Sequence, residues 1–175
     1  MKKIISIVLS AAMMMCMLAS CGGDKKSEVT GPDGTLTEII EKIYETCQPE
    51  FGVATIDVDL ADEFARKAYT GLDSSDQITE AVASESMIGS QAYSLVLVRV
   101  KEGADIDEVA QAMKNGIDQR KWICVEADNI RVSGAGDVVM LVMISTELSS
   151  DKLSVDTITD TFKTLCGGTL TVDIK

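Results

Sequence analysis

Residues 138–145 read VVMLVMIS, and residues 94–100 read SLVLVRV. Both stretches are dense in β-branched and aliphatic side chains, which is typical of strands. Successive side chains of a strand point to opposite faces of its sheet, so an uninterrupted apolar run predicts a sheet that is covered on both faces. Residues 129–133 precede the first stretch, and Gly134-Ala135-Gly136-Asp137 between them is a hairpin signal. The strands are therefore expected to pair antiparallel.

Helical signals surround these strands. Apolar residues recur at helical spacing in four segments, and each segment follows a residue that can accept hydrogen bonds from a helix N-terminus. Proline or glycine closes three of them: Pro49, Gly71 and Gly167-Gly168. The expected helices are residues 36–47, 59–69, 106–122 and 154–166, with N-caps at Thr35, Asp59, Asp105 and Ser154.

The order of these elements predicts the fold class. Residues 79–86 alternate weakly and add a strand, and the tail at 169–174 can form an edge strand. The order is α-α-β-β-α-β-β-α, with an optional final β. We expect an α+β fold with an antiparallel sheet of about four strands and packed helices. Helices 106–122 and 154–166 are expected to share one face, and helices 36–47 and 59–69 to cover the other.

The N-terminus has the layout of a secretory signal. Lys2 and Lys3 precede an uncharged run at residues 4–17, which is shorter than the roughly 20 apolar residues that a membrane-spanning helix needs. The stretch Leu18-Ala19-Ser20-Cys21 resembles the lipobox of bacterial lipoproteins, in which the thiol receives a diacylglyceryl group. This predicts cleavage before Cys21 and lipidation of Cys21. The alternative is an ordinary cleaved signal that ends near Ala19 or Ser20.

Three regions follow from this interpretation. Residues 1–20 form the signal peptide, and residues 21–34 combine the lipidated cysteine with a Gly-, Ser- and Lys-containing tether. Residues 35–175 have the length of a single domain. The expected location is the extracytoplasmic face of the cell membrane, held there by the lipid.

The charge of the chain argues against a nucleic-acid partner. Removing residues 1–20 takes away two lysines and no acid, so the net charge changes from −12 to −14. Nucleic-acid binding depends on clustered Lys and Arg, and the longest basic run in the remainder beyond the tether is Arg120-Lys121.

The remaining thiols indicate no redox or zinc site. Cys47, Cys124 and Cys166 are far apart in sequence and form no C-x-x-C motif. We expect all three to be small buried hydrophobic residues. The sequence leaves their disulfide status open.

Candidate catalytic residues are few. The chain contains no histidine, which removes the usual general base near neutral pH and the commonest metal ligand. Ser149-x-x-Lys152 matches the S-x-x-K of acyl-serine enzymes, but the companion motifs are missing, and the stretch is better interpreted as the approach to a helix. Trp122 and Tyr93 are the first aromatic candidates for ligand contact, although packing is the more common use.

Paired carboxylates are the other candidates. Asp57 with Asp59, and Asp105 with Asp107, precede expected helices, where a carboxylate complements the helix dipole. Neither pair has the spacing of a calcium loop. We therefore expect no dedicated metal site and no cofactor, and weak calcium binding to the acidic surface is the alternative that the sequence leaves open.

A family resemblance rests on several of these features together: the lipobox, a short acidic linker, SLVLVRVKEG at 94–103, Asp118-Gln119-Arg120-Lys121, and NIRVSGAGDVVMLVMIS at 129–145. Over residues 35–165 the chain resembles the domain of unknown function 4358 found in lipoproteins of Gram-positive anaerobes. The resemblance implies no activity and no catalytic residues.

The functional expectation is accordingly general. We expect a membrane-anchored extracytoplasmic lipoprotein that is not an enzyme and binds an envelope protein or a small ligand. The alternatives are a hydrolase or transferase that uses carboxylates alone, and a structural assembly subunit. The oligomeric state is left open.

Overall fold

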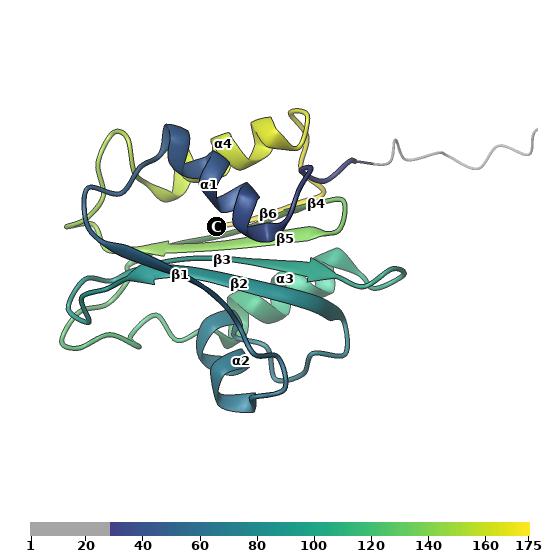
Figure 1. The fold of residues 1–175 in the computed structure, drawn as a ribbon, viewed down its shortest axis with the longest axis horizontal. Helices are drawn as coiled ribbons and strands as arrows, with labels where there is room; N and C mark the ends of the chain where they lie inside the picture. Colours follow the sequence, from purple (N-terminus) through teal and green to yellow (C-terminus); the bar gives the residue numbers. More distant parts are fainter. Residues whose placement is uncertain (1–28) are drawn as a thin grey trace, which may run out of the picture.

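The computed structural model describes residues 29–175, which fold into one antiparallel sheet with helices on both faces (Figure 1). The α+β class with an antiparallel sheet is confirmed, but the sheet has six strands where about four were expected. Its spatial order is β1-β2-β3-β5-β4-β6. The elements are α1 (Leu36–Thr46), β1 (Val53–Asp57), α2 (Glu63–Thr70), β2 (Ile78–Ser86), β3 (Tyr93–Val100), α3 (Ile106–Gly116), β4 (Asn129–Ala135), β5 (Val138–Ile144), α4 (Val155–Leu165) and β6 (Val172–Ile174).

The two edge strands account for the difference in strand number. No strand was expected at the residues of β1, and four of its five residues are exposed. An exposed strand has neither the apolar run nor the clean alternation that marks a strand in sequence. At the opposite edge, β6 occupies only the end of the 169–174 tail.

The helices are paired differently from the expectation. Helices α1 and α4 lie on one face of the sheet, and α2 and α3 lie on the other (Figure 1). The strand β1 is the physical reason. After α1 the chain forms this edge strand and then continues to the opposite face, which places α1 and α2 on different faces.

Helix α2 begins later than expected. Its N-cap is Asp62, whose carboxylate accepts hydrogen bonds from the N–H groups of Phe64 and Ala65 at 2.9 and 3.2 Å. Asp59, the expected cap, instead accepts a bond from Ala61 N–H in the preceding turn. Aspartate at either position can cap a helix, but the helical residues begin at Glu63, so Asp62 is the cap.

Helix α3 ends earlier than the expected 106–122. The C-cap residue of α2, Gly71, has φ +75°, and its backbone packs directly against Gly116 at the end of α3. A Cβ on Gly116 would lie 2.0 Å from Gly71 O, so only glycine permits this approach. Ile117 then turns to an extended conformation, and the chain leaves the helix.

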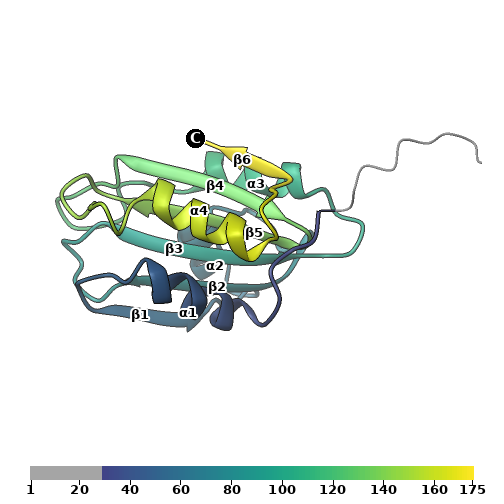
Figure 2. The same cartoon turned by 90° about the horizontal axis from the view of Figure 1, so that it is seen from above.

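The core consists of two layers separated by the sheet. All seven residues of β5 are buried, and alternate side chains enter opposite layers. Met140 and Val142 pack with α1 and α4, whereas Leu141 and Met143 pack with α2 and α3. The expectation that both faces of this strand are covered is confirmed. Figure 2 shows β5 in the interior of the sheet, with β1 and β6 at its edges.

The β4–β5 turn is tighter than the expected Gly134–Asp137 connection. The strands extend to Ala135 and Val138, so only Gly136 and Asp137 form the turn, with Gly136 at φ +60°. A Cβ on Gly136 would lie 2.2 Å from the backbone nitrogen of Gly31. Residues 29–34, the last part of the expected tether, therefore lie against this turn. Within residues 29–175, no helix combines the length and apolarity needed to cross a bilayer.

The burial of α1 yields a first prediction. Ile40 in α1 is fully buried, so Ile40→Ala should lower the free energy of unfolding by about 2–5 kcal/mol through lost burial and an internal cavity. Urea denaturation monitored by circular dichroism measures the change. Glu41→Ala, at the exposed neighbouring position, is the control and should change stability by less than about 0.5 kcal/mol. Equal effects of both substitutions would contradict the packing of α1 described here.

Candidate functional site

The S-x-x-K residues lie in the segment before α4, as expected. Ser149 Oγ donates a hydrogen bond to the carbonyl of Ser145 at 3.1 Å, and Lys152 is exposed. No contact between the two side chains is found in the described part of the chain. The geometry therefore gives Ser149 a local backbone partner and does not pair it with a base.

One carboxylate of each pair, Asp105 and Asp59, accepts hydrogen bonds from nearby backbone N–H groups. Asp105 caps α3 by accepting bonds from the N–H groups of Asp107 and Glu108, as expected. Asp59 closes the turn before α2 and does not cap that helix. Among residues 29–175, no group of three His, Cys, Asp or Glu residues is close enough to hold a metal ion.

A chain of hydroxyl groups lies on the α1 side of the sheet. Tyr93, fully buried, donates to the hydroxyl of Tyr44 at 3.1 Å, which donates to Ser84 Oγ at 2.8 Å. Thr55 Oγ1 of β1 also donates to Ser84 Oγ, at 3.0 Å. Burial raises the pKa of Tyr44 and raises that of Tyr93 well above its usual value. The network thus consists of neutral hydroxyls that link α1, β1, β2 and β3.

A partly buried ion pair lies on the opposite face. Lys121 Nζ pairs with Glu85 of β2 and also donates to the carbonyl of Ala68 at 3.1 Å. The rings of Tyr69 and Trp122 each have their centroid 5.3 Å from this nitrogen, within the range of a cation–π contact. Trp122 is therefore a packing partner of a lysine of the same chain, and this pair attaches the 117–128 segment to the sheet.

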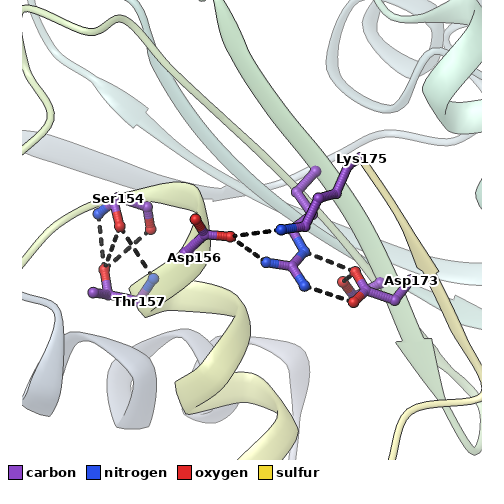
Figure 3. Close-up of polar contacts among 7 residues, drawn as sticks. Ser154, Asp156, Thr157, Asp173 and Lys175 are labelled. Atoms are coloured by element: carbon purple, nitrogen blue, oxygen red, sulfur yellow. Dashed lines mark hydrogen bonds and ion pairs between the residues drawn. The ribbon is translucent and has the colours of Figure 1, made fainter.

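The first turn of α4 positions a carboxylate toward β4 and β6. Ser154 and Thr157 form the capping box that begins the helix, with the Thr157 N–H donating to Ser154 Oγ at 3.1 Å. Ser154 was the expected cap, and this is confirmed. Figure 3 shows Asp156, between these two residues in sequence, directed toward Lys175.

Arg131 of β4 is the centre of a polar cluster at this position. Its guanidinium binds Asp173 of β6 through two hydrogen bonds, Nε at 2.7 Å and Nη2 at 2.6 Å, and it also pairs with Asp156. Ser133 Oγ donates to Asp173 at 3.0 Å, and Lys175 lies 3.5 Å from Asp156. These bonds fasten the three-residue β6 to its neighbour. Sequence reasoning missed the cluster because Arg131 and Asp173 are 42 positions apart.

An open groove of about 1300 Å³ lies where residues 29–34 enter the domain. Its other walls are the β3–α3 connection and the β4–β5 turn. The cations in it already have partners: Arg99 binds Asp137 at 2.8 Å and the carbonyl of Gly34 at 2.9 Å, and Lys101 donates to the carbonyl of Asp76 at 2.8 Å. The groove is large enough for a small ligand, but its cations are engaged within the chain.

The outer edge of β1 is the most accessible part of the sheet. The strand pairs with β2 on one side only, and four of its five residues are exposed. Ile56 is 41 % exposed in this strand, and Phe64 of α2 is 83 % exposed. An exposed apolar side chain, Ile56, on a strand that is unpaired on one side distinguishes this region from the self-paired clusters. We take the edge of β1 as the candidate functional site.

Two of the three thiols are buried, and one is not. Cys47 and Cys166 are buried as expected, and burial raises the pKa of Cys166 to about 11. Cys124, also expected to be buried, is exposed. It has φ +60° and lies in the irregular segment between α3 and β4, outside both core layers. All three are free thiols in this structure.

Cys21 and the predicted signal peptide lie outside residues 29–175, so the structure describes neither. No protein-family model matches the chain, and neither a curated protein nor a solved structure is similar enough to match it.

The Arg131 cluster gives a pH-dependent prediction. Hydrogen bonds from Arg131 lower the pKa of Asp173, so the folded state favours the ionised carboxyl. The resulting stability is complete above the unfolded pKa of about 3.9 and is lost as pH falls through the lower folded pKa. Asp173→Asn should therefore cost about 1–2 kcal/mol at pH 7, because Asp173 is partly exposed. The cost should disappear in strong acid.

Denaturant unfolding of both proteins between pH 7 and pH 2 measures this difference. Asp151→Asn, an exposed acid on the loop before α4, is the matched control and should follow the wild-type protein throughout. A constant difference between Asp173→Asn and wild type at every pH would contradict the ionic origin of the effect.

The thiols give a third prediction. At pH 8, a thiol with a pKa of about 11 has roughly two-hundredfold less thiolate than free cysteine. Iodoacetamide should therefore label Cys124 rapidly in the folded protein, and Cys166 and buried Cys47 slowly. Peptide mass mapping after timed labelling distinguishes the sites. In urea, which unfolds the protein, all three thiols should be labelled at similar rates. Slow labelling of Cys124 in native protein would contradict its exposure.

Proposed function

We propose that this chain is an extracytoplasmic lipoprotein, anchored to the cell membrane by a diacylglyceryl group on Cys21, and that its domain binds an envelope protein and is not an enzyme. The observation that carries the proposal is the edge of β1, which is unpaired on its outer side and exposes Ile56. Proteins usually shield such edges because they are templates for pairing with another chain.

The other polar clusters of the described domain have evident structural uses. The pair Lys121–Glu85 attaches the 117–128 segment to the sheet, and Arg131 with Asp173 attaches β6. Each charged group in these clusters has its partner within the fold. The partly buried charges of these clusters are therefore explained by their structural role, and no substrate is needed to explain them.

The anchor is supported by the lipobox-like Leu18-Ala19-Ser20-Cys21 after a short apolar run. Residues 21–28 can span at most about 29 Å even if fully extended. On this proposal the domain stays close to the membrane, with the β4–β5 turn beside the entering chain. Membership in the domain of unknown function 4358 family is part of the same proposal and adds no activity.

A small ligand is the second candidate partner. The groove of about 1300 Å³ beside residues 29–34 favours it, because its volume exceeds the several hundred cubic ångströms that such ligand sites commonly have. The edge of β1 is the stronger candidate because its backbone groups are unpaired, whereas the groove cations already have partners.

The anchor is tested by Cys21→Ala. The wild-type protein, expressed in a Gram-positive host fed a labelled fatty acid, should incorporate the label and fractionate with the membrane. The substitution should abolish incorporation, because only a thiol at this position forms the thioether. Cys124→Ala, which removes an exposed thiol of the domain, is the control and should leave labelling intact. Lipid label on the Cys21→Ala protein would refute the anchor.

The binding role is tested by chemical crosslinking in the native membrane followed by purification under denaturing conditions. A partner recovered in stoichiometric amount from wild-type cells is the expected result. Recovery of the chain alone, together with turnover of a substrate by the purified protein, would contradict a binding module and favour an enzyme.

A further inference from the structure

We propose that the outer edge of β1 binds an extended, positively charged polypeptide segment, which adds to the sheet as a seventh strand. The inference rests on the binding role proposed above and specifies the chemistry of the partner. Three properties of the edge carry it: the direction of its backbone groups, the lack of shielding, and its charge.

The register with β2 determines which backbone groups of β1 are free. The carbonyl of Gly52 accepts from Met87 N–H, and Val58 N–H donates to the carbonyl of Ala81, both at 2.9 Å. Inward and outward backbone groups alternate along an antiparallel strand. The N–H and C=O groups of Val53, Thr55 and Asp57 therefore point away from β2, toward the open side.

The edge of β1 has one charged residue, Asp57, and lacks several other usual devices that prevent pairing. Its sequence, VATID, contains no proline and no lysine, and its register with β2 is regular from Val53 to Asp57. The other edge differs, because β6 has only three residues and Asp173 within it is held by Arg131. A partner strand is therefore expected at β1 and not at β6.

The side chains of β1 offer different contacts on its two faces. Thr55 points to the α1 side, where it bonds to Ser84. Ile56 points to the α2 side and is 41 % exposed. On that side a strand added next to β1 could place an apolar side chain against Ile56, and such cross-strand pairs contribute to the stability of a sheet.

The charge around the edge selects the partner. Residues 43–65, which include β1, contain six carboxylates and no lysine or arginine. All six carboxylate residues are exposed: Glu45, Glu50, Asp57, Asp59, Asp62 and Glu63. Opposite charges across an interface speed encounter and exclude partners of like charge. A cationic segment fits this edge, whereas a second copy of this acidic chain would meet the same six negative charges.

The free backbone groups, the exposed Ile56 and the negative charge together indicate the class of partner. A row of alternating N–H and C=O groups is matched by the backbone of another polypeptide, which is the basis of strand addition in peptide recognition. A small ligand or a lipid surface does not present such a row. The expected partner segment is therefore extended, carries Lys or Arg, and has apolar residues at alternate positions.

The test uses the full-length lipoprotein in a nonionic detergent and two fluorescent nine-residue peptides. One peptide alternates lysine with valine, and the other alternates glutamate with valine. Fluorescence anisotropy should show binding of the lysine peptide only, with affinity that falls as salt is raised. Amide exchange measured by NMR should slow at Val53, Thr55 and Asp57 on binding and stay unchanged at Ala54 and Ile56.

Two edge variants test the backbone contact. Thr55→Pro removes an outward N–H and leaves the backbone bonds to β2 in place, but it also removes the side-chain bond to Ser84. Ile56→Lys places a cation on the edge without altering the backbone. Each should weaken binding of the lysine peptide at least about tenfold. Ile56→Lys keeps the test decisive if Thr55→Pro lowers the melting temperature of the domain.

Matched charge variants test the electrostatic contribution. Glu50→Gln with Asp57→Asn removes two charges that flank β1 and should weaken binding several-fold. Glu102→Gln with Asp151→Asn removes two exposed charges outside residues 43–65 and should leave the affinity close to wild type. If both double variants weakened binding equally, the affinity would depend on the net charge of the chain and not on the position of the charges. That result would overturn the assignment to this edge.

Other results would also overturn the inference. These are equal binding of the glutamate peptide, unchanged affinity in folded Ile56→Lys, or protection of amides away from β1. A dimer of the wild-type protein that Ile56→Lys dissociates would assign the edge to a second copy. If the lysine peptide fails to bind while Cys21 is lipidated and a membrane partner is crosslinked, only this inference falls. If the peptide binds but no partner or lipid is found, the proposed function falls instead.

Discussion

Burial of β5 on both of its faces is the constraint on which the structure depends. All seven of its residues are apolar and buried, and their side chains alternate between two separate layers of the core. Water on either face would expose a continuous apolar strip, so helices must cover both. The three-layer arrangement, with α1 and α4 on one side and α2 and α3 on the other, satisfies this requirement (Figure 1).

The elements that sequence predicted well have strong local signals. The capping boxes at Thr35 and Ser154 mark the starts of α1 and α4, and the apolar runs mark β3 and β5. The missed features depend on distant partners. The strand β1 exists because β2 pairs with it, and α3 ends where Gly116 meets Gly71. Missing β1 also led to the wrong pairing of helices, because that strand carries the chain from one face to the other.

The candidate site was less predictable than the fold. Its main property is that β1 has no neighbouring strand on its outer side. The strand order of the sheet shows this, whereas a single sequence does not. The acidic stretch at 43–65 was visible in the sequence, but its position around a free edge was not. The preferred interpretation of the two aromatic candidates, packing within the domain, is confirmed. Tyr93 and Trp122 have partners at Tyr44 and Lys121, and the partner of Tyr93 is 49 positions away.

Covering both faces of the sheet also limits how the domain can meet a partner. Helices occupy the faces, β6 is held at one edge by Arg131, and the chain enters beside the β4–β5 turn at one end. Of the two sheet edges, β1 is the one where the backbone groups of alternate residues remain unpaired over its whole length, because only β2 pairs with it. Having a neighbouring strand on one side only leaves β1 poorly buried, and poorly buried residues give no strand signal in the sequence. The same lack of a second neighbour leaves its outer side free to pair. Recognition through the backbone of this strand would require little of the partner's sequence beyond extended conformation, alternating apolar residues and positive charge.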